Sequence, residues 1–226
     1  GSVESQDGTD IDGSGHGSHV AGIIAAVANN GIGGSGVAPR AKILPIQVLD
    51  QAGQGDARDV AAGVRFAADN GAKVINLSLG GTTESSSLTQ AIQYATDKGA
   101  LVVAAAGNGG APDKPKWPAS LDLTLAVTAV DQSNSATPFD QRGDYIDIAA
   151  PGTNIVSTAK GDYVSLSGTS MAAGFVAGTA ALLFAAEPRI TNAQVRDILL
   201  RTSTDIGEPG RDLTFGVGLI NMVAAL

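Results

Sequence analysis

The sequence predicts an α/β protein, a three-layer α/β/α sandwich around a mostly parallel central sheet. Helical and short apolar segments alternate along most of the 226 residues, and this alternation is typical of a parallel sheet with crossover helices. The 30 glycines stand mainly between these segments, where they mark strand ends and helix starts. Since 43% of the residues are hydrophobic, the chain can bury one large core. We therefore expect a single domain over residues 1–226.

The first half of the chain contains two predicted helices and two predicted strands. Residues 16–28 are rich in Ala and Ile and predict a helix, and residues 41–50 predict a strand. Residues 56–71 have helical spacing and end in a glycine, which favours a second helix. Residues 73–81 form an apolar run ending in glycines, which predicts a buried strand.

The second half continues the same alternation. Residues 86–99 predict a helix, and residues 100–110 predict a strand followed by a glycine-rich turn. Further strands are expected at 123–130 and 145–152, and Ser170 opens a long apolar helix. Because ligands bind outside the carboxyl ends of parallel strands, the loops that follow the predicted strands should share one functional rim.

The charge balance excludes some classes of partner. Acidic residues number 22 and basic residues 14, which gives a net charge of −8 and argues against binding to nucleic acid or to an anionic membrane. The apolar stretches 100–106 and 177–186 are shorter than a bilayer-spanning helix. We therefore expect a soluble protein with no membrane partner. The chain has no cysteine, so its redox compartment is left open.

Ser170 stands among small residues in SLSGTSMAAGFVAG, at the start of the predicted helix. Serine is favoured as a helix cap, and it is also a nucleophile when a base lies within hydrogen-bond reach. The histidines of the chain are His16 and His19. Their i, i+3 spacing is compatible with a metal pair, although neither cysteine nor an H-E-x-x-H pattern accompanies them. For His19 we expect a structural role.

Three blocks occur in an order that identifies a known family. GHGSHVAG at 15–22, AAAGNGG at 104–110 and SGTSMAAGFVAG at 167–178 resemble the His, oxyanion-Asn and Ser blocks of subtilisin-like serine peptidases. The connecting segments VINLSLGG, APGTNIVST, TNAQVRDIL and FGVGLIN resemble the same family. The likeness extends from about residue 13 to nearly the end of the chain.

The resemblance implies a serine endopeptidase acting on polypeptides, with a secreted or extracytoplasmic location. It assigns His16 as general base, Ser170 as nucleophile and Asn108 as a side-chain donor to the oxyanion. The chemistry is coherent, because a helix N-terminus at Ser170 favours developing negative charge. A turn asparagine at position 108 is the structural alternative. An inactive peptide-binding protein, and an acyl transferase or peptide ligase using the same site, are alternative functions.

The resemblance also implies where substrate binds. Two segments should pair with an extended peptide through their backbones, and these are Gly53, Gln54 and Gly55, and Ser78, Leu79 and Gly80. The residue before the scissile bond should meet the walls formed by Ala104, Ala105, Ala106 and Gly107. Because these walls carry no charge, we expect large apolar or aromatic side chains to be preferred there.

A calcium loop is the one cofactor site that the resemblance implies. Residues 26–36 are polar and glycine-rich, and oxygen ligands suit a hard cation. The ligands would be the Asn30 side chain and the carbonyls of Ala28, Ile32 and Gly34. A helix C-cap at the asparagines is the alternative interpretation.

Two features depart from the family pattern. The triad aspartate is expected on an early strand roughly 30 residues before the histidine, whereas only Asp7, Asp10 and Asp12 precede His16. We therefore expect the domain to be N-terminally incomplete, with an N-terminal fragment or pro-segment of the same precursor as a partner. The alternatives are that this segment is lost and the site is broken, or that one of the three aspartates orients His16. Gly174 also replaces a proline that the family usually has after the nucleophile.

Overall fold

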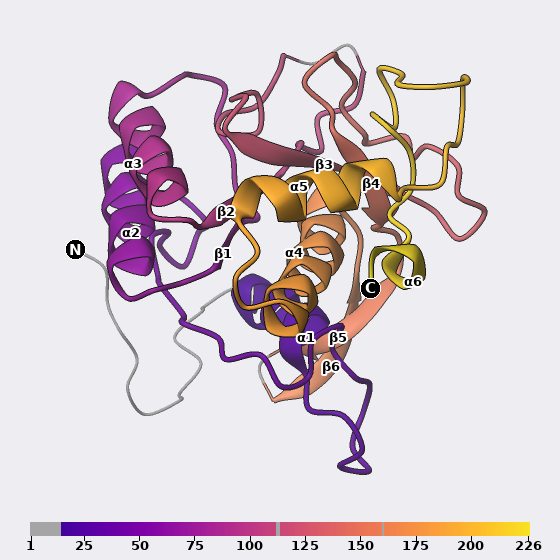
Figure 1. Cartoon of the computed structure of the whole chain (residues 1–226), viewed down its shortest axis with the longest axis horizontal. Coiled ribbons are helices and arrows are strands. Elements are labelled where there is room, and N and C mark those ends of the chain that lie inside the picture. The colour runs from indigo at the N-terminus through magenta and orange to yellow at the C-terminus, as the bar shows by residue number, and fades with distance from the viewer. Residues whose placement is uncertain (1–14, 112–113, 160) are drawn as a thin grey trace.

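The computed structural model describes residues 15–111, 114–159 and 161–226, and its centre is a parallel sheet (Figure 1). The strands are β1 (Val74–Leu77), β2 (Leu101–Ala105), β3 (Thr124–Val130) and β4 (Ile148–Pro151). They lie in the order β1-β2-β3-β4 and every neighbouring pair is parallel. Nearly all their residues are buried, as expected when both faces of a parallel sheet are covered. The predicted α/β/α sandwich is therefore confirmed.

Helices α2 (Ala57–Asp69) and α3 (Ser86–Asp97) cover one face of the sheet. Asp56 caps α2 by accepting a hydrogen bond from the Arg58 N–H, which satisfies a donor that the helix itself leaves free. Val64 of α2 and Ile92 of α3 pack into one apolar cluster with strand residues such as Val102. Two adjacent helices thus bury one side of the sheet.

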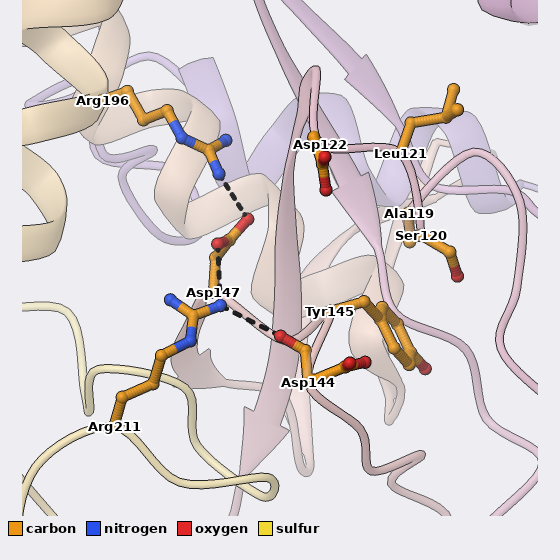
Figure 2. Close-up of a pocket in the computed structure, with 9 residues that line it drawn as sticks. All are labelled: Ala119, Ser120, Leu121, Asp122, Asp144, Tyr145, Asp147, Arg196 and Arg211. Atoms are coloured by element: carbon orange, nitrogen blue, oxygen red, sulfur yellow. Dashed lines mark hydrogen bonds and ion pairs between the residues drawn. The ribbon is translucent and has the colours of Figure 1, made fainter.

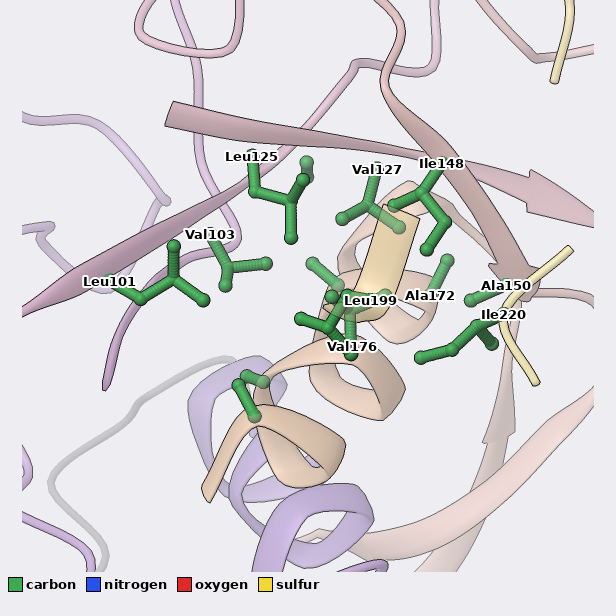
Figure 3. Packing of buried hydrophobic residues seen from close by; sticks show 14 of the residues in the cluster. Leu101, Val103, Leu125, Val127, Ile148, Ala150, Ala172, Val176, Leu199 and Ile220 are labelled. Atoms are coloured by element: carbon green, nitrogen blue, oxygen red, sulfur yellow. The ribbon is translucent and has the colours of Figure 1, made fainter. Parts of the chain in front are cut away.

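The other face is covered by α4 (Thr169–Ala186), with α1 (His16–Ala25) and α5 (Asn192–Arg201) beside it. In the core, Leu125 and Val127 of β3 face Val176 of α4 and Leu199 of α5 (Figure 3). By length and composition α4 could also cross a bilayer. Because most of it is buried against the sheet, we interpret α4 as the central core helix. A short helix, α6 (Met222–Ala225), ends the chain.

An antiparallel hairpin, β5 (Ile155–Ala159) with β6 (Asp162–Leu166), packs against α1. His19 is completely buried, and its Nε2 lies 3.0 Å from the Ile155 carbonyl oxygen and 3.1 Å from that of Val164. Both neighbours are acceptors, so Nε2 carries the proton. The structural role expected for His19 is thus to fasten the hairpin to the helix.

The strand predicted over 41–50 is wrong. Within residues 41–48 only Gln47 lies in an isolated bridge, because no described strand forms a ladder with this segment. Ile43 and Leu44 are left 43% and 36% exposed. Sequence analysis also missed β5, β6 and the two C-terminal helices. The first helix, predicted over 16–28, ends at Ala25, where the chain turns into a glycine-rich loop.

Candidate active site

Ser170 is the second residue of α4 and is about nine-tenths buried. The helix begins at Gly168, which has φ 156° and ψ 163°, an arrangement that favours glycine. The Gly168 N–H donates to the Gly152 carbonyl, so the turn before the helix is tied to the end of β4. Within the described residues, no acceptor is present for the Ser170 N–H. The Ser170 N–H is therefore available to donate to a group that binds at the start of α4.

Asn108 is fixed against this helix start by its side-chain oxygen. Oδ1 accepts from the Thr169 N–H at 2.9 Å and from Thr169 Oγ1 at 3.0 Å. Thr169 Oγ1 in turn accepts from the Gly107 N–H at 3.1 Å. With Oδ1 occupied, the Nδ2 amide projects beside Gly168, where an added Cβ would lie 3.0 Å from it. The structure thus brings Asn108 and Ser170 together with two N–H donors available to an anion.

Ser78 holds Ser170 from the other side. Ser78 Oγ donates to the Ser170 carbonyl at 2.9 Å, and Ser170 Oγ donates to the Ser78 carbonyl at 3.4 Å. Asn76 of β1 donates from Nδ2 to Ser78 Oγ at 2.9 Å. The loop after β1 is therefore bonded to the first turn of α4, which fixes the backbone of Ser170.

His16 is the first residue of α1 and is half-buried. One turn further along α1, Val20 and Ile23 pack on Met171 in the first turn of α4. Gly174 allows this approach, because a Cβ there would lie 3.1 Å from Ile23 Cγ2. This packing sets α1, which His16 begins, against the first two turns of α4, which include Ser170.

The predicted peptide-binding segments lie at the carboxyl ends of the first two strands and in a nearby turn. Ser78, Leu79 and Gly80 directly follow β1, and residues 104–107 are the end of β2 and the turn after it. Asp50 shapes the turn at 50–54, because its Oδ1 accepts from the N–H groups of Ala52 and Gln54. Ala104 and Ala106 are fully buried. Neither the side chain nor the backbone of these two residues is accessible.

The loop predicted to hold calcium is exposed from residue 29 to residue 35. Asn29 and Gly31 have positive φ angles, and Asn30 Oδ1 accepts from the Ile32 N–H at 3.0 Å. Among described residues no cluster of three or more His, Cys, Asp or Glu side chains could hold a metal. The donor chemistry of the loop, one amide oxygen and carbonyl oxygens, still fits a calcium ion.

Sequence analysis missed two buried polar residues near the turn that holds Gly107 and Asn108. They are Asp140 and Gln141, which are 2% and 0% exposed. Burial raises the pKa of Asp140, while a hydrogen bond from the Thr137 N–H opposes the shift. A Cβ on Gly107 would overlap Gln141 Oε1. Only the tertiary fold brings these side chains against the turn, so no local pattern could have indicated them.

A cavity of about 240 Å³ is lined by residues outside the Ser170 and Asn108 region (Figure 2). Asp147 lies at its wall and forms ion pairs with Arg196 at 2.9 Å and Arg211 at 3.2 Å. Asp147 Oδ2 also accepts from the Ala126 N–H. These bonds fasten α5 and the C-terminal loop to the sheet. Tyr145 connects the cavity to the active site, because its hydroxyl donates to the Ala106 carbonyl.

The predicted acid of the triad is not located. Asp7, Asp10 and Asp12 lie outside the described residues. The part of the site that the structure describes therefore consists of the Ser170 region, Asn108 and the start of α1.

Comparison with known proteins gives one family. A family model described as "Subtilase family" matches residues 2–218. "Subtilisin Savinase" from Lederbergia lenta is 46% identical over 215 residues, which are 95% of this chain and 78% of that protein. "Alkaline protease" from Alkalihalobacillus alcalophilus is equally identical, but the chain spans only 55% of its length. The solved structure of "Sphericase" has a TM-score of 0.88 and 33% identity, covering 98% of this chain and 84% of that one.

Proposed function

Because the chain belongs to the subtilase family, we propose that it is a serine endopeptidase that cleaves polypeptides through an acyl-enzyme on Ser170. The observation that carries the proposal is the hydrogen bonding of Asn108 to Thr169. It orients the side-chain amide toward the helix start, where the Ser170 N–H is also available. Two fixed donors at this place stabilise the oxyanion that forms when a serine attacks a peptide carbonyl.

His16 acts as the general base in this proposal. It takes the proton from the Ser170 hydroxyl during attack and returns it to the leaving amine. The weak 3.4 Å bond from Ser170 Oγ to the Ser78 carbonyl must break for this transfer. A peptide paired with residues 78–80 competes for the same carbonyl, so substrate binding favours release of the hydroxyl toward the base.

We also propose that the acid of the triad lies on a further strand, carried by an N-terminal fragment or pro-segment of the same precursor. Among the strands described, β1 pairs only with β2, which leaves its other edge open. On β1, Asn76 Oδ1 is buried without a hydrogen-bond partner. Ile43 and Leu44, which lie between α1 and α2 in a segment without a strand, are exposed. A strand added at this edge would satisfy Asn76 and cover apolar surface.

Calcium binding at residues 28–34 and a secreted location are further proposals from the same family membership. The ion would be held by Asn30 Oδ1 and the carbonyls of Ala28, Ile32 and Gly34. Because these four ligands are neutral, they would bind calcium weakly unless further ligands complete the site. The ion would stabilise the folded state by mass action.

The function is tested with a fluorophosphonate probe, which reacts only with an activated serine. Covalent labelling of the native protein, and none in Ser170→Ala, is the expected result. Intact mass spectrometry of the same sample shows whether a smaller peptide bearing an aspartate accompanies the chain. Failure of the native protein to label, with its fold intact, would favour the inactive peptide-binding alternative.

A further inference from the structure

Lys116 lies between Gly80, at the end of the segment predicted to pair with the substrate backbone, and Gly107, in the predicted wall of the pocket for the residue before the scissile bond. A Cβ added to Gly80 would lie 3.4 Å from Lys116 Cβ. A Cβ added to Gly107 would lie 2.6 Å from Lys116 Cγ. The first part of the lysine stem therefore touches both predicted binding segments, because it extends from the loop after β1 to the turn after β2.

The backbone around Lys116 is held firmly in this place. Its neighbour Trp117 exchanges two backbone hydrogen bonds with Gly81, at 2.9 and 2.8 Å. The Lys116 carbonyl accepts from both the N–H and the Oγ of Ser120. These bonds fix the Cα of Lys116 relative to residues 78–81. The side chain consequently starts from one wall of the site and cannot leave it without breaking the bridge to Gly81.

The chemistry of this position differs from that of the two predicted substrate-binding segments. Residues 78–80 and 104–107 carry no charge, whereas lysine brings an ammonium on a flexible stem. Gln141 Oε1 contacts the same glycine, Gly107, and is buried without a hydrogen-bond partner. An amide oxygen at the back of the site stabilises a nearby ammonium and repels a carboxylate, so it favours a cation between itself and the substrate.

We propose that Lys116 is a specificity-determining residue that recognises an acidic side chain, Glu or Asp, immediately before the scissile bond. This inference rests on the proposed endopeptidase function. It replaces the preference for large apolar side chains that the uncharged walls alone predicted. A carboxylate at this position gains a charge-assisted hydrogen bond in a partly desolvated site, while a basic side chain is repelled.

The test compares four peptides that differ only at this residue, carrying Glu, Gln, Phe or Lys. For the native protein, supplied with its N-terminal partner where that is needed for activity, kcat/KM should be highest for Glu. In Lys116→Met the ratio of kcat/KM for Glu over Gln should fall about tenfold, and in Lys116→Glu the Lys peptide should become the better substrate. Lys73→Met is the matched control, because Lys73 is exposed just before β1, at its opposite end.

The outcomes separate this inference from the function on which it rests. Hydrolysis of the Phe peptide by Lys116→Met shows that the variant is folded and active. If the Glu-to-Gln ratio is then the same as in the native protein, Lys116 is not the determinant. If the native protein cleaves none of the peptides and does not react with the fluorophosphonate probe, the endopeptidase function is overturned and the inference with it. A Glu preference that also disappears in Lys73→Met would show a general charge effect and overturn the role of Lys116.

Discussion

The N–H of Thr169 donates to Oδ1 of Asn108 at 2.9 Å, which joins the first residue of α4 to the turn after β2. Thr169 adds a second bond to the same oxygen through Oγ1 and receives one from the Gly107 N–H. An asparagine amide has one acceptor end and one donor end. Holding the acceptor end therefore determines where the donor end points, before any substrate arrives.

Asn108→Leu should lower turnover about 10²- to 10³-fold, the size of effect found for such a donor in subtilisin. Thr169→Val keeps the shape of the side chain but removes the Oγ1 bonds to Asn108 and Gly107, and a loss of about tenfold is expected. Both losses should appear in kcat with little change in KM, because the donor acts in the transition state. Steady-state kinetics on one peptide checks this, and a pure KM effect would contradict the assignment.

Ser170→Ala and His16→Ala should each abolish most peptide hydrolysis, by a factor on the order of 10⁶ in turnover as in subtilisin. The two substitutions act on one unit, so the double variant should be no worse than either single one. Initial rates with a sensitive fluorogenic peptide measure this. Near-native activity in either single variant would reject that residue's role.

The sequence predicted the parts of the site that short motifs define. Ser170 and Asn108 each follow a buried strand or a glycine turn, and the parallel sheet brings such positions to one rim. Lys116 escaped prediction because its place between Gly80 and Gly107 depends on a bridge between Trp117 and Gly81. A contact of this kind joins segments that lie far apart along the chain. No local pattern contains it.

The sequence also predicts a strand over 41–50 that the structure does not contain. Its apolar residues have the composition of a strand, and Ile46 and Val48 do pack on the core beside α2. A strand also needs a neighbour for its backbone groups, and the described residues form no ladder with this segment. Composition therefore indicated that part of the segment packs on the core, whereas pairing decides whether it becomes a strand.

Chelation of calcium should lower the melting temperature if residues 28–34 bind the ion. Asn30→Ala removes the one side-chain ligand, so the variant should respond less to added calcium or to EDTA. Differential scanning calorimetry with and without EDTA measures both proteins. The effect should be larger with the N-terminal partner present, and an identical melting temperature in that reconstituted protein under both conditions would reject the site.

Asp140 should make stability depend on pH in an unusual direction for a carboxylate. Its pKa is raised by burial, so the folded state binds a proton more tightly than the unfolded state does. The charged form costs stability above the folded pKa, and the cost disappears as pH falls toward the ordinary carboxyl value of about 3.8. Asp140→Asn should therefore stabilise the protein at neutral pH, with a benefit that shrinks on acidification.

Urea unfolding of the native protein and of Asp140→Asn between pH 4 and pH 8 tests this expectation. Asp131→Asn is the control, since Asp131 lies in the preceding turn, where it accepts from the N–H groups of Ser133 and Ser135 at exposed positions. If the free energies of unfolding of the native protein and Asp140→Asn differ by the same amount at every pH, the pKa of Asp140 is not raised by folding.

Gly174 lies where α1 crosses α4, one turn after Ser170. A Cβ at this position would be 3.1 Å from Ile23 Cγ2 and 3.6 Å from Val20 Cγ1. Proline would in addition remove the N–H that can bond to the Ser170 carbonyl, and its ring would crowd that carbonyl. Ser78 Oγ would still donate to the same carbonyl, so the helix start should survive the substitution.

Because glycine does not crowd the Ser170 carbonyl, Ser170 keeps room beside its acyl group, and the native protein should transfer part of its acyl groups to an added peptide amine instead of water. Gly174→Pro should lower the ratio of aminolysis to hydrolysis, since crowding of the Ser170 backbone carbonyl shifts Ser170 and leaves less room beside its acyl group for a bulky nucleophile. Gly174→Ala is the control, because it adds the contact with Ile23 yet keeps the N–H. Product ratios are measured by chromatography at matched concentrations of acyl donor and amine. Equal ratios in the native protein and Gly174→Pro would mean that the glycine serves only the packing of α1 on α4.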